Sequence, residues 1–118
     1  MVKMLRVVFL LIVAVSLSAC SVGKGIKLAV DCKTDEALHV LEQAEHGGGL
    51  TGRLAILEQE AVLRDAGRMN EAEALRAKRE SQPGYTEKDK AEAEKAVLET
   101  VDNIRNERKK QTGKATCN

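Results

Sequence analysis

The chain has 118 residues, with 19 Lys and Arg against 18 Asp and Glu, and a formal net charge of +1. This balance argues against a nucleic-acid binder, which normally carries a basic excess. The length allows one small domain. With one Phe, one Tyr and no Trp, its core must consist of Leu, Val, Ile and Ala. Small domains bury little surface, so we expect an additional stabilising element.

The first 20 residues have the composition of an export signal. Lys3 and Arg6 form a short cationic start, an apolar run covers residues 7–15, and small residues precede Cys20. This order is typical of a secretory signal peptide. The run is shorter than the roughly 20 apolar residues that a membrane span requires. An ordinary signal peptide or an uncleaved anchor would leave Cys20 without a special role.

Residues 17–20, Leu-Ser-Ala-Cys, resemble the lipobox of bacterial lipoproteins. The resemblance implies cleavage before Cys20, diacylglycerol on its thiol and acylation of the new amino terminus. Several acyl chains anchor a protein stably. Ser21 stands where an aspartate would favour the inner membrane in that family, which implies an outer-membrane lipoprotein facing the periplasm. We therefore expect a signal peptide over 1–19, a lipidated tether over 20–31 and a helical domain over 32–118.

Two cysteines remain in the exported chain, Cys32 and Cys117. An even pair in an oxidising compartment favours a disulfide. A bridge closing so long a loop is expected to contribute roughly 4–5 kcal/mol. Two free thiols, a metal site and a bond to a partner are the alternatives. Metal is disfavoured because neither cysteine has a second Cys or a His nearby in the sequence, and we expect no cofactor.

Residues 21–31 are predicted to form a tether, with two glycines near its start. Within this tether, residues 26–30 are predicted to form a short strand or an extended segment that packs on the body. A first helix is predicted to begin at Thr34 as its N-cap. Gly47, Gly48 and Gly49 end it.

A second helix follows Thr51, with Leu54, Leu57 and Ala61 on its inner stripe and the charges of Arg53, Glu58 and Arg64 facing solvent. Gly67 is a natural C-cap, and a third helix runs from about Met69 to Ser81. One continuous helix through Gly67 is the alternative, because a mid-helix glycine costs only about 1 kcal/mol.

A fourth helix is predicted after Thr86, with Asp89 completing a capping box, and ends near Lys110. Its apolar stripe comprises Ala91, Leu98 and Val101, widened by Val97 and Ile104. An even number of antiparallel helices returns the chain to its starting end, which would bring Cys117 beside Cys32. The expected fold is all-α, a small antiparallel bundle of about four helices.

A weak repeat lies within these helices. Residues 35–38, Asp-Glu-Ala-Leu, are echoed 35 residues later by residues 70–73, Asn-Glu-Ala-Glu. This pattern resembles the tetratricopeptide repeat, a helix-turn-helix unit of 34 residues. The resemblance implies that the alanine after each glutamate packs against the preceding helix and that Gly67 lies in a turn. Leu41 and Ala44 match a large and a small position of the repeat's second helix. Glu60 departs from it, since a small residue is expected there.

No catalytic constellation is found. The mature chain has only two serines, and Ser21 lies in the tether, whereas a catalytic triad needs residues held by a framework. His39 and His46 are seven residues apart, too far for one chelate. Gly47–Gly49 lacks the lysine and hydroxyl of a phosphate loop. We expect a non-enzymatic protein.

A basic cluster near the C-terminus is a candidate contact with anionic lipid head groups or acidic cell-wall groups. Helix C-termini also favour cations without any function. The cluster comprises Arg105, Arg108, Lys109, Lys110 and Lys114.

Two function classes follow. The first is a lipid-anchored adaptor, a helical module that binds another envelope protein through a concave groove of small residues formed by the second and third helices. The second is an anchored inhibitor or immunity-type protein that blocks one target. The expected partners are the membrane, through the acyl chains on Cys20, and an envelope protein, but no nucleic acid.

Overall fold

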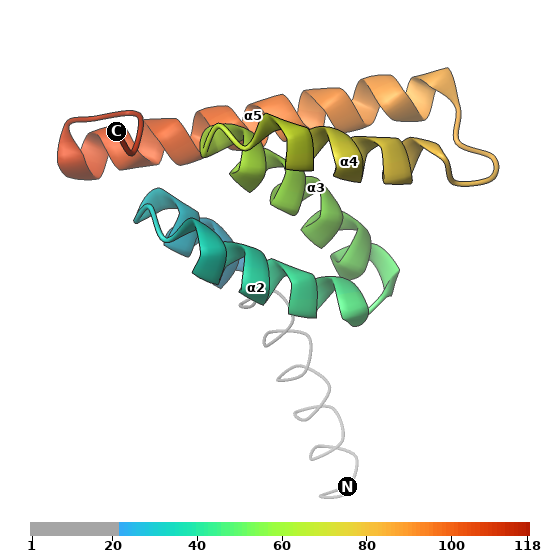
Figure 1. The fold of residues 1–118 in the computed structure, drawn as a ribbon, viewed down its shortest axis with the longest axis horizontal. Helices are drawn as coiled ribbons and strands as arrows, with labels where there is room; N and C mark the ends of the chain where they lie inside the picture. Colours follow the sequence, from blue (N-terminus) through green and yellow to red (C-terminus); the bar gives the residue numbers. More distant parts are fainter. Residues whose placement is uncertain (1–21) are drawn as a thin grey trace, which may run out of the picture.

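The computed structural model describes residues 22–118, so the predicted signal peptide and Cys20 lie outside the described residues. Within this range the chain is helical and contains no strand, which confirms the all-α prediction (Figure 1). The elements are a helical segment over residues 22–30, α2 (Thr34–His46), α3 (Gly49–Asp65), α4 (Met69–Glu80) and α5 (Glu87–Thr112).

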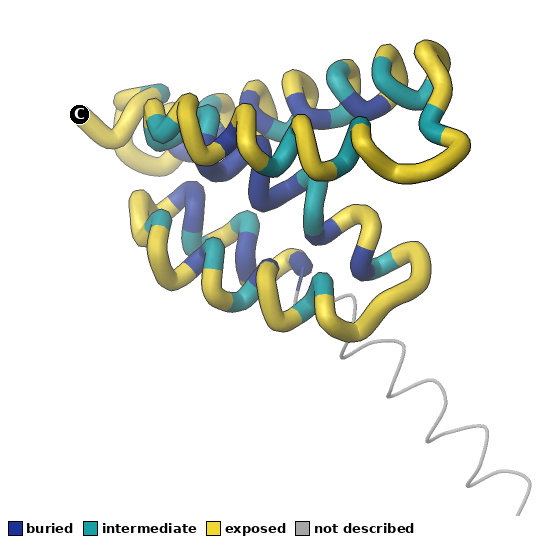
Figure 2. The backbone as a smooth tube through the Cα atoms, turned by 45° about the vertical axis from the view of Figure 1, so that its right-hand side comes forward, coloured by how far each residue is buried: buried dark blue, intermediate teal, exposed yellow. Residues whose placement is uncertain are grey.

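Helix α3 is the centre of the arrangement. It packs against α2 on one side and against α4 and α5 on the other, and it runs obliquely between these layers (Figure 1). One core cluster joins Leu41, Val62 and Ile104 with smaller residues, and a second one is centred on Val97 and Val101. Buried positions follow the faces that the helices turn toward one another (Figure 2).

The segment over residues 22–30 corrects one expectation. It is a helix, not a strand or an extended segment, although it does pack on the body, with Ala29 and Val30 buried. Gly25 is the reason that the sequence suggested a tether in place of a helix. A Cβ atom at Gly25 would lie 2.6 Å from the side chain of Leu41, so this glycine permits close helix packing where the sequence suggested flexibility.

Most helix ends follow the predicted signals. Gly67 adopts the left-handed conformation, with φ +75°, and separates α3 from α4, so the continuous-helix alternative is wrong. The predicted capping box is present: Asp89 N donates to Thr86 Oγ1 at 3.1 Å, and Thr86 N donates to Asp89 Oδ2 at 2.9 Å. Thr34 is the first helical residue rather than the N-cap, which is Lys33.

The predicted faces of α3 and α5 need correction. Glu58 is buried and Leu54 is 45% exposed, the reverse of the expected pattern, because α3 has helices on two sides. On α5, Leu98 is 49% exposed and the stripe is centred on Val97, Val101 and Ile104.

The weak sequence repeat corresponds to two similar helical hairpins. Hairpin one is the segment over residues 22–30 with α2, and hairpin two is α3 with α4. Their turns match in backbone conformation: Cys32 and Gly67 have φ of 61° and 75°, and the next residues, Lys33 and Arg68, both have ψ of 64°.

The alanines that follow the glutamates of the repeat are core residues in both hairpins. Ala37 and Ala72 are 0% and 1% exposed, as the repeat pattern predicts. The two turns also contact each other directly, since Arg68 Nη1 lies 2.6 Å from Asp35 Oδ1.

The Cys32–Cys117 disulfide is present, with Cα atoms 5.7 Å apart and a sequence separation of 85 residues. Between the two cysteines lie four helices, and Gly113, with φ +79°, turns the tail back from the end of α5. Within residues 22–118, no helix is long and apolar enough to span a membrane.

Candidate functional site

Arg108, the central member of the predicted basic cluster, does not face the surface. It is 1% exposed, so it cannot contact an anionic surface, and that part of the prediction is wrong. A guanidinium has five N–H donors, and all five are engaged. Two bonds go to Asp65, at 2.6 and 3.0 Å, and three go to the carbonyls of Ala29, Val30 and Ala115 at 2.6, 3.1 and 2.7 Å.

These bonds make Arg108 the junction of the fold. The carbonyls of Ala29 and Val30 lie at the end of the first helical segment, where backbone acceptors are short of internal partners. The Ala29 carbonyl also accepts a bond from Cys32 N at 3.0 Å. Asp65 ends α3, and its carboxylate also accepts a bond from Arg105 Nε at 3.1 Å. One buried side chain of α5 therefore joins the ends of two other helices to the C-terminal tail.

The other members of the cluster differ from Arg108. Lys109, Lys110 and Lys114 are exposed, and Arg105 is half-buried beside Asp65. The exposed lysines lie at the end of the bundle that carries the Cys32–Cys117 bridge, one helix length from residue 22. Head-group contact by these three lysines stays a prediction.

The histidines are not brought together. His39 lies within 3.2 Å of Gln43 on the surface of α2, and His46 is exposed at the end of this helix. Within residues 22–118, no group of three His, Cys, Asp or Glu residues is placed to hold a metal ion.

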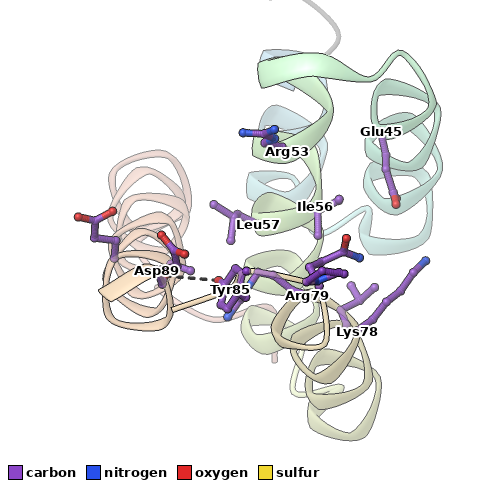
Figure 3. Close-up of a pocket in the computed structure, with 14 residues that line it drawn as sticks. Glu45, Arg53, Ile56, Leu57, Lys78, Arg79, Tyr85 and Asp89 are labelled. Atoms are coloured by element: carbon purple, nitrogen blue, oxygen red, sulfur yellow. Dashed lines mark hydrogen bonds between the residues drawn. The ribbon is translucent and has the colours of Figure 1, made fainter. Parts of the chain in front are cut away.

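One concave feature of the described residues is a groove of about 710 Å³ between α3, α4, the α4–α5 loop and the start of α5. We call it the α3–α4–α5 groove (Figure 3). Its apolar lining consists of Ile56, Leu57, Leu75, Pro83, Tyr85 and Ala93, and its polar lining includes Glu45, Arg53, Lys78, Arg79, Gln82, Asp89 and Glu92.

Tyr85 lies between Asp89 and Arg79 in the view of Figure 3, with Leu57 above it. Its hydroxyl donates to the carbonyl of Asp89 at 3.4 Å. This bond joins the α4–α5 loop to the first turn of α5. The Asp89 carboxylate is itself engaged by the backbone and hydroxyl of Thr86, which lowers its pKa.

The charges of the groove fall into two groups. Arg79 Nη1 is bonded to the fully buried Glu60 at 2.9 Å, while its Nε and Nη2 have no hydrogen-bond partner. Arg53 and Lys78 form no ion pair with the described residues. The α3 and α4 walls thus offer cations whose charge is not neutralised within the described part of the chain.

An ionic network lies behind the groove. Arg64 binds Glu94 through two hydrogen bonds, at 2.9 and 3.1 Å, which lower the pKa of Glu94 and raise that of Arg64. Arg64 also lies 3.8 Å from Glu60. This network holds α3 against α5 and positions Arg79 through Glu60.

Sequence reasoning anticipated a groove from the second and third helices, but not its lining. We expected small residues, whereas Leu75, Tyr85 and Ile56 are large. Tyr85 is the available signal, because it is the one Phe, Trp or Tyr residue in residues 22–118 and aromatic side chains are enriched at interfaces.

Comparison with protein-family models, with curated proteins and with solved structures finds no match for this chain. The fold and the groove therefore carry the functional argument.

Proposed function

We propose that this protein is a lipid-anchored cell-envelope module whose α3–α4–α5 groove binds a segment of another envelope protein. The observation that carries the proposal is the groove itself, about 710 Å³ in volume and lined by six apolar residues. Apolar hollows with a few polar groups are typical of binding sites, and burial of one partner side chain of Leu or Phe size contributes about 1.5–3 kcal/mol.

The cations on the groove walls favour a partner segment that carries a carboxylate beside its apolar anchor. Arg53 and Lys78 are exposed and form no ion pair with the described residues. The acidic lining is partly committed elsewhere, since Glu45 accepts a bond from Gln59 at 2.9 Å and Asp89 caps α5. Charge complementarity of this kind supplies specificity more than affinity.

The proposed anchor is supported by the Leu-Ser-Ala-Cys sequence of residues 17–20. Acylation of Cys20 would fix the protein two residues before the first described helix, in the outer membrane and facing the periplasm. Processing to an N-terminal acylated Cys20, measured by mass spectrometry, tests this part. A Cys20→Ser variant that still carries acyl chains would contradict it.

Site-specific crosslinking tests the binding role. A photoreactive residue replacing Leu75, in the groove, is expected to capture one defined envelope protein. The same residue replacing Leu98, which is 49% exposed on α5 outside the groove, should not. An added Ile56→Asp change is expected to lower the Leu75 crosslink at least tenfold.

Equal crosslinking from Leu75 and Leu98, or a crosslink insensitive to Ile56→Asp, would contradict the groove as the binding site. If the crosslink captures a secreted enzyme or toxin in place of an envelope component, the protein functions as an anchored inhibitor and not as an adaptor.

A further inference from the structure

The corner between α2 and α3 exposes apolar side chains that the core does not use. Leu50 is 82% exposed and Leu54 is 45% exposed, and their spacing of four residues places them on one face of α3. Leu50 has the highest exposure among the exposed large hydrophobic residues of the described chain.

The same corner is depleted in negative charge. Acidic residues number 18 in the 118-residue chain, yet none lies between Glu45 and Glu58. The charged or titratable groups in that interval are Arg53 and His46, both exposed. Exposed leucines and a cation, with no carboxylate between Glu45 and Glu58, make this corner unlike the charged surfaces of α4 and α5.

The corner also lies at the end of the molecule where the described chain begins. Gly25 packs against Leu41, and Gly52 lies so close to the carbonyl of Glu45 that an added Cβ would be 2.9 Å away. Residue 22 is therefore level with the last turn of α2 and the first turn of α3.

The distance from this end to Cys20 is short. Two peptide units separate Cys20 from Val22, and consecutive Cα atoms are 3.8 Å apart, so the two Cα atoms lie within about 8 Å of each other. Acyl chains on Cys20 would hold the bilayer surface within that distance of residue 22. The partner that this corner meets first is then the bilayer itself.

We propose that the α2–α3 corner rests on the bilayer that holds the acyl chains of Cys20, with Leu50 and Leu54 in the boundary between head groups and acyl chains. The inference rests on the proposed anchor. Amphipathic surfaces bind there through apolar side chains flanked by cations, and Arg53 and the exposed Lys24 supply positive charge for phosphate groups. Glu42 and Glu45 of α2 are the nearby opposing charges, and the Glu45 carboxylate accepts a bond from Gln59.

The absence of Trp from the chain allows a direct test with single tryptophan reporters in the acylated full-length protein. Leu50→Trp and Leu54→Trp report on the corner. Met69→Trp is the matched control, because Met69 is 48% exposed and lies beside Arg68, which pairs with Asp35 at the opposite end of α2.

On phosphatidylethanolamine–phosphatidylglycerol vesicles, we expect the Leu50→Trp emission to shift to the blue. Brominated lipid should quench it at least threefold more than the Met69→Trp emission, and Leu54→Trp should behave like Leu50→Trp. If the protein floats with the vesicles but acrylamide quenches both corner variants as strongly as Met69→Trp, the anchor stands and the docking is overturned. Protein that lacks acyl chains by mass spectrometry would overturn the anchor and the docking together.

Discussion

Hairpin one and hairpin two have the same turn and different interiors. Gly25 and Ala44 of hairpin one correspond, at an offset of 35 residues, to Glu60 and Arg79 of hairpin two. Gly25 packs against the fully buried Leu41, whereas Glu60, also fully buried, forms an ion pair with Arg79 at 2.9 Å.

This difference shows that the turn and its alanine define the hairpin, while the chemistry between its helices can vary. A buried ion pair is weak evidence for added stability, because desolvation offsets the attraction. Its effect here is to hold the largely buried side chain of Arg79 at the wall of the groove. Both hairpins contribute residues to the core, and hairpin two also forms most of the α3 and α4 walls of the groove.

The largest expected effect comes from Arg108, which joins the two hairpins at equivalent positions, the carbonyl of Val30 and the carboxylate of Asp65. Arg108→Met leaves Asp65 buried without its main partner, and breaking such a pair costs about 3–5 kcal/mol. Urea unfolding measures this loss. Lys109→Met, at the adjacent exposed position, should change the free energy of unfolding by less than about 0.5 kcal/mol. Equal effects of the two substitutions would contradict the role of Arg108 in joining the helix ends.

The next effect concerns Glu58, whose counterpart in hairpin one is the exposed Gly23. Burial raises the pKa of Glu58 from 4.5 to about 7. The folded protein then binds this proton more tightly than the unfolded chain does, so stability falls as pH rises from about 4.5 to about 7. A shift of this size corresponds to at most about 3 kcal/mol.

Glu58→Gln should remove this dependence. We expect the variant to match the wild type near pH 4 and to exceed it in unfolding free energy above pH 7, measured by denaturation across that range. Parallel pH profiles for the two proteins would argue against a buried, titrating Glu58.

Gly25→Ala tests the close contact within hairpin one. The added methyl group meets the side chain of Leu41, and overpacking of this kind costs about 1–3 kcal/mol. Gly23→Ala is the matched control, with no atom within 4 Å of the added Cβ, and should stabilise the helix by about 0.5–1 kcal/mol. Thermal unfolding distinguishes the two, and a stabilising Gly25→Ala would exclude tight packing there.

The smallest effect concerns the left-handed turn position, which is Cys32 in one hairpin and Gly67 in the other. A residue with a Cβ atom costs about 1–2 kcal/mol in this conformation. The comparison uses two variants that both lack the disulfide because both carry Cys117→Ser. The variant with Cys32→Gly should therefore be about 1 kcal/mol more stable than the variant with Cys32→Ser. Equal stabilities would indicate that the turn relaxes once the bridge is absent.

Local signals in the sequence were sufficient for most of the fold. Gly67, Pro83 and the Thr86–Asp89 capping box act through nearby backbone geometry, so helix ends could be predicted from them. The even number of cysteines after Cys20 and the predicted export to an oxidising compartment were enough to propose the Cys32–Cys117 disulfide.

The errors arose where burial depends on residues far apart in the sequence. Gly25 resembles a flexible linker residue until Leu41 is placed against it. Glu58, Glu60 and Asp65 resemble solvent-facing charges, because their helical neighbours do not reveal that α3 is surrounded. Arg108 lies within a basic run, and its role depends on Asp65, 43 residues earlier. The groove lining joins three elements for the same reason.

The Cys32–Cys117 bridge has a mechanical consequence. Tension applied between residue 22 and the C-terminus would pass along residues 22–32, across the covalent bond and out through Asn118, so helices α2 to α5 would lie outside the path of the force. The 85-residue separation corresponds to roughly 300 Å of extended chain that cannot be drawn out while the bridge is intact. Pulling experiments on the oxidised protein should show the extension of a short peptide, and reduction should release the remaining length.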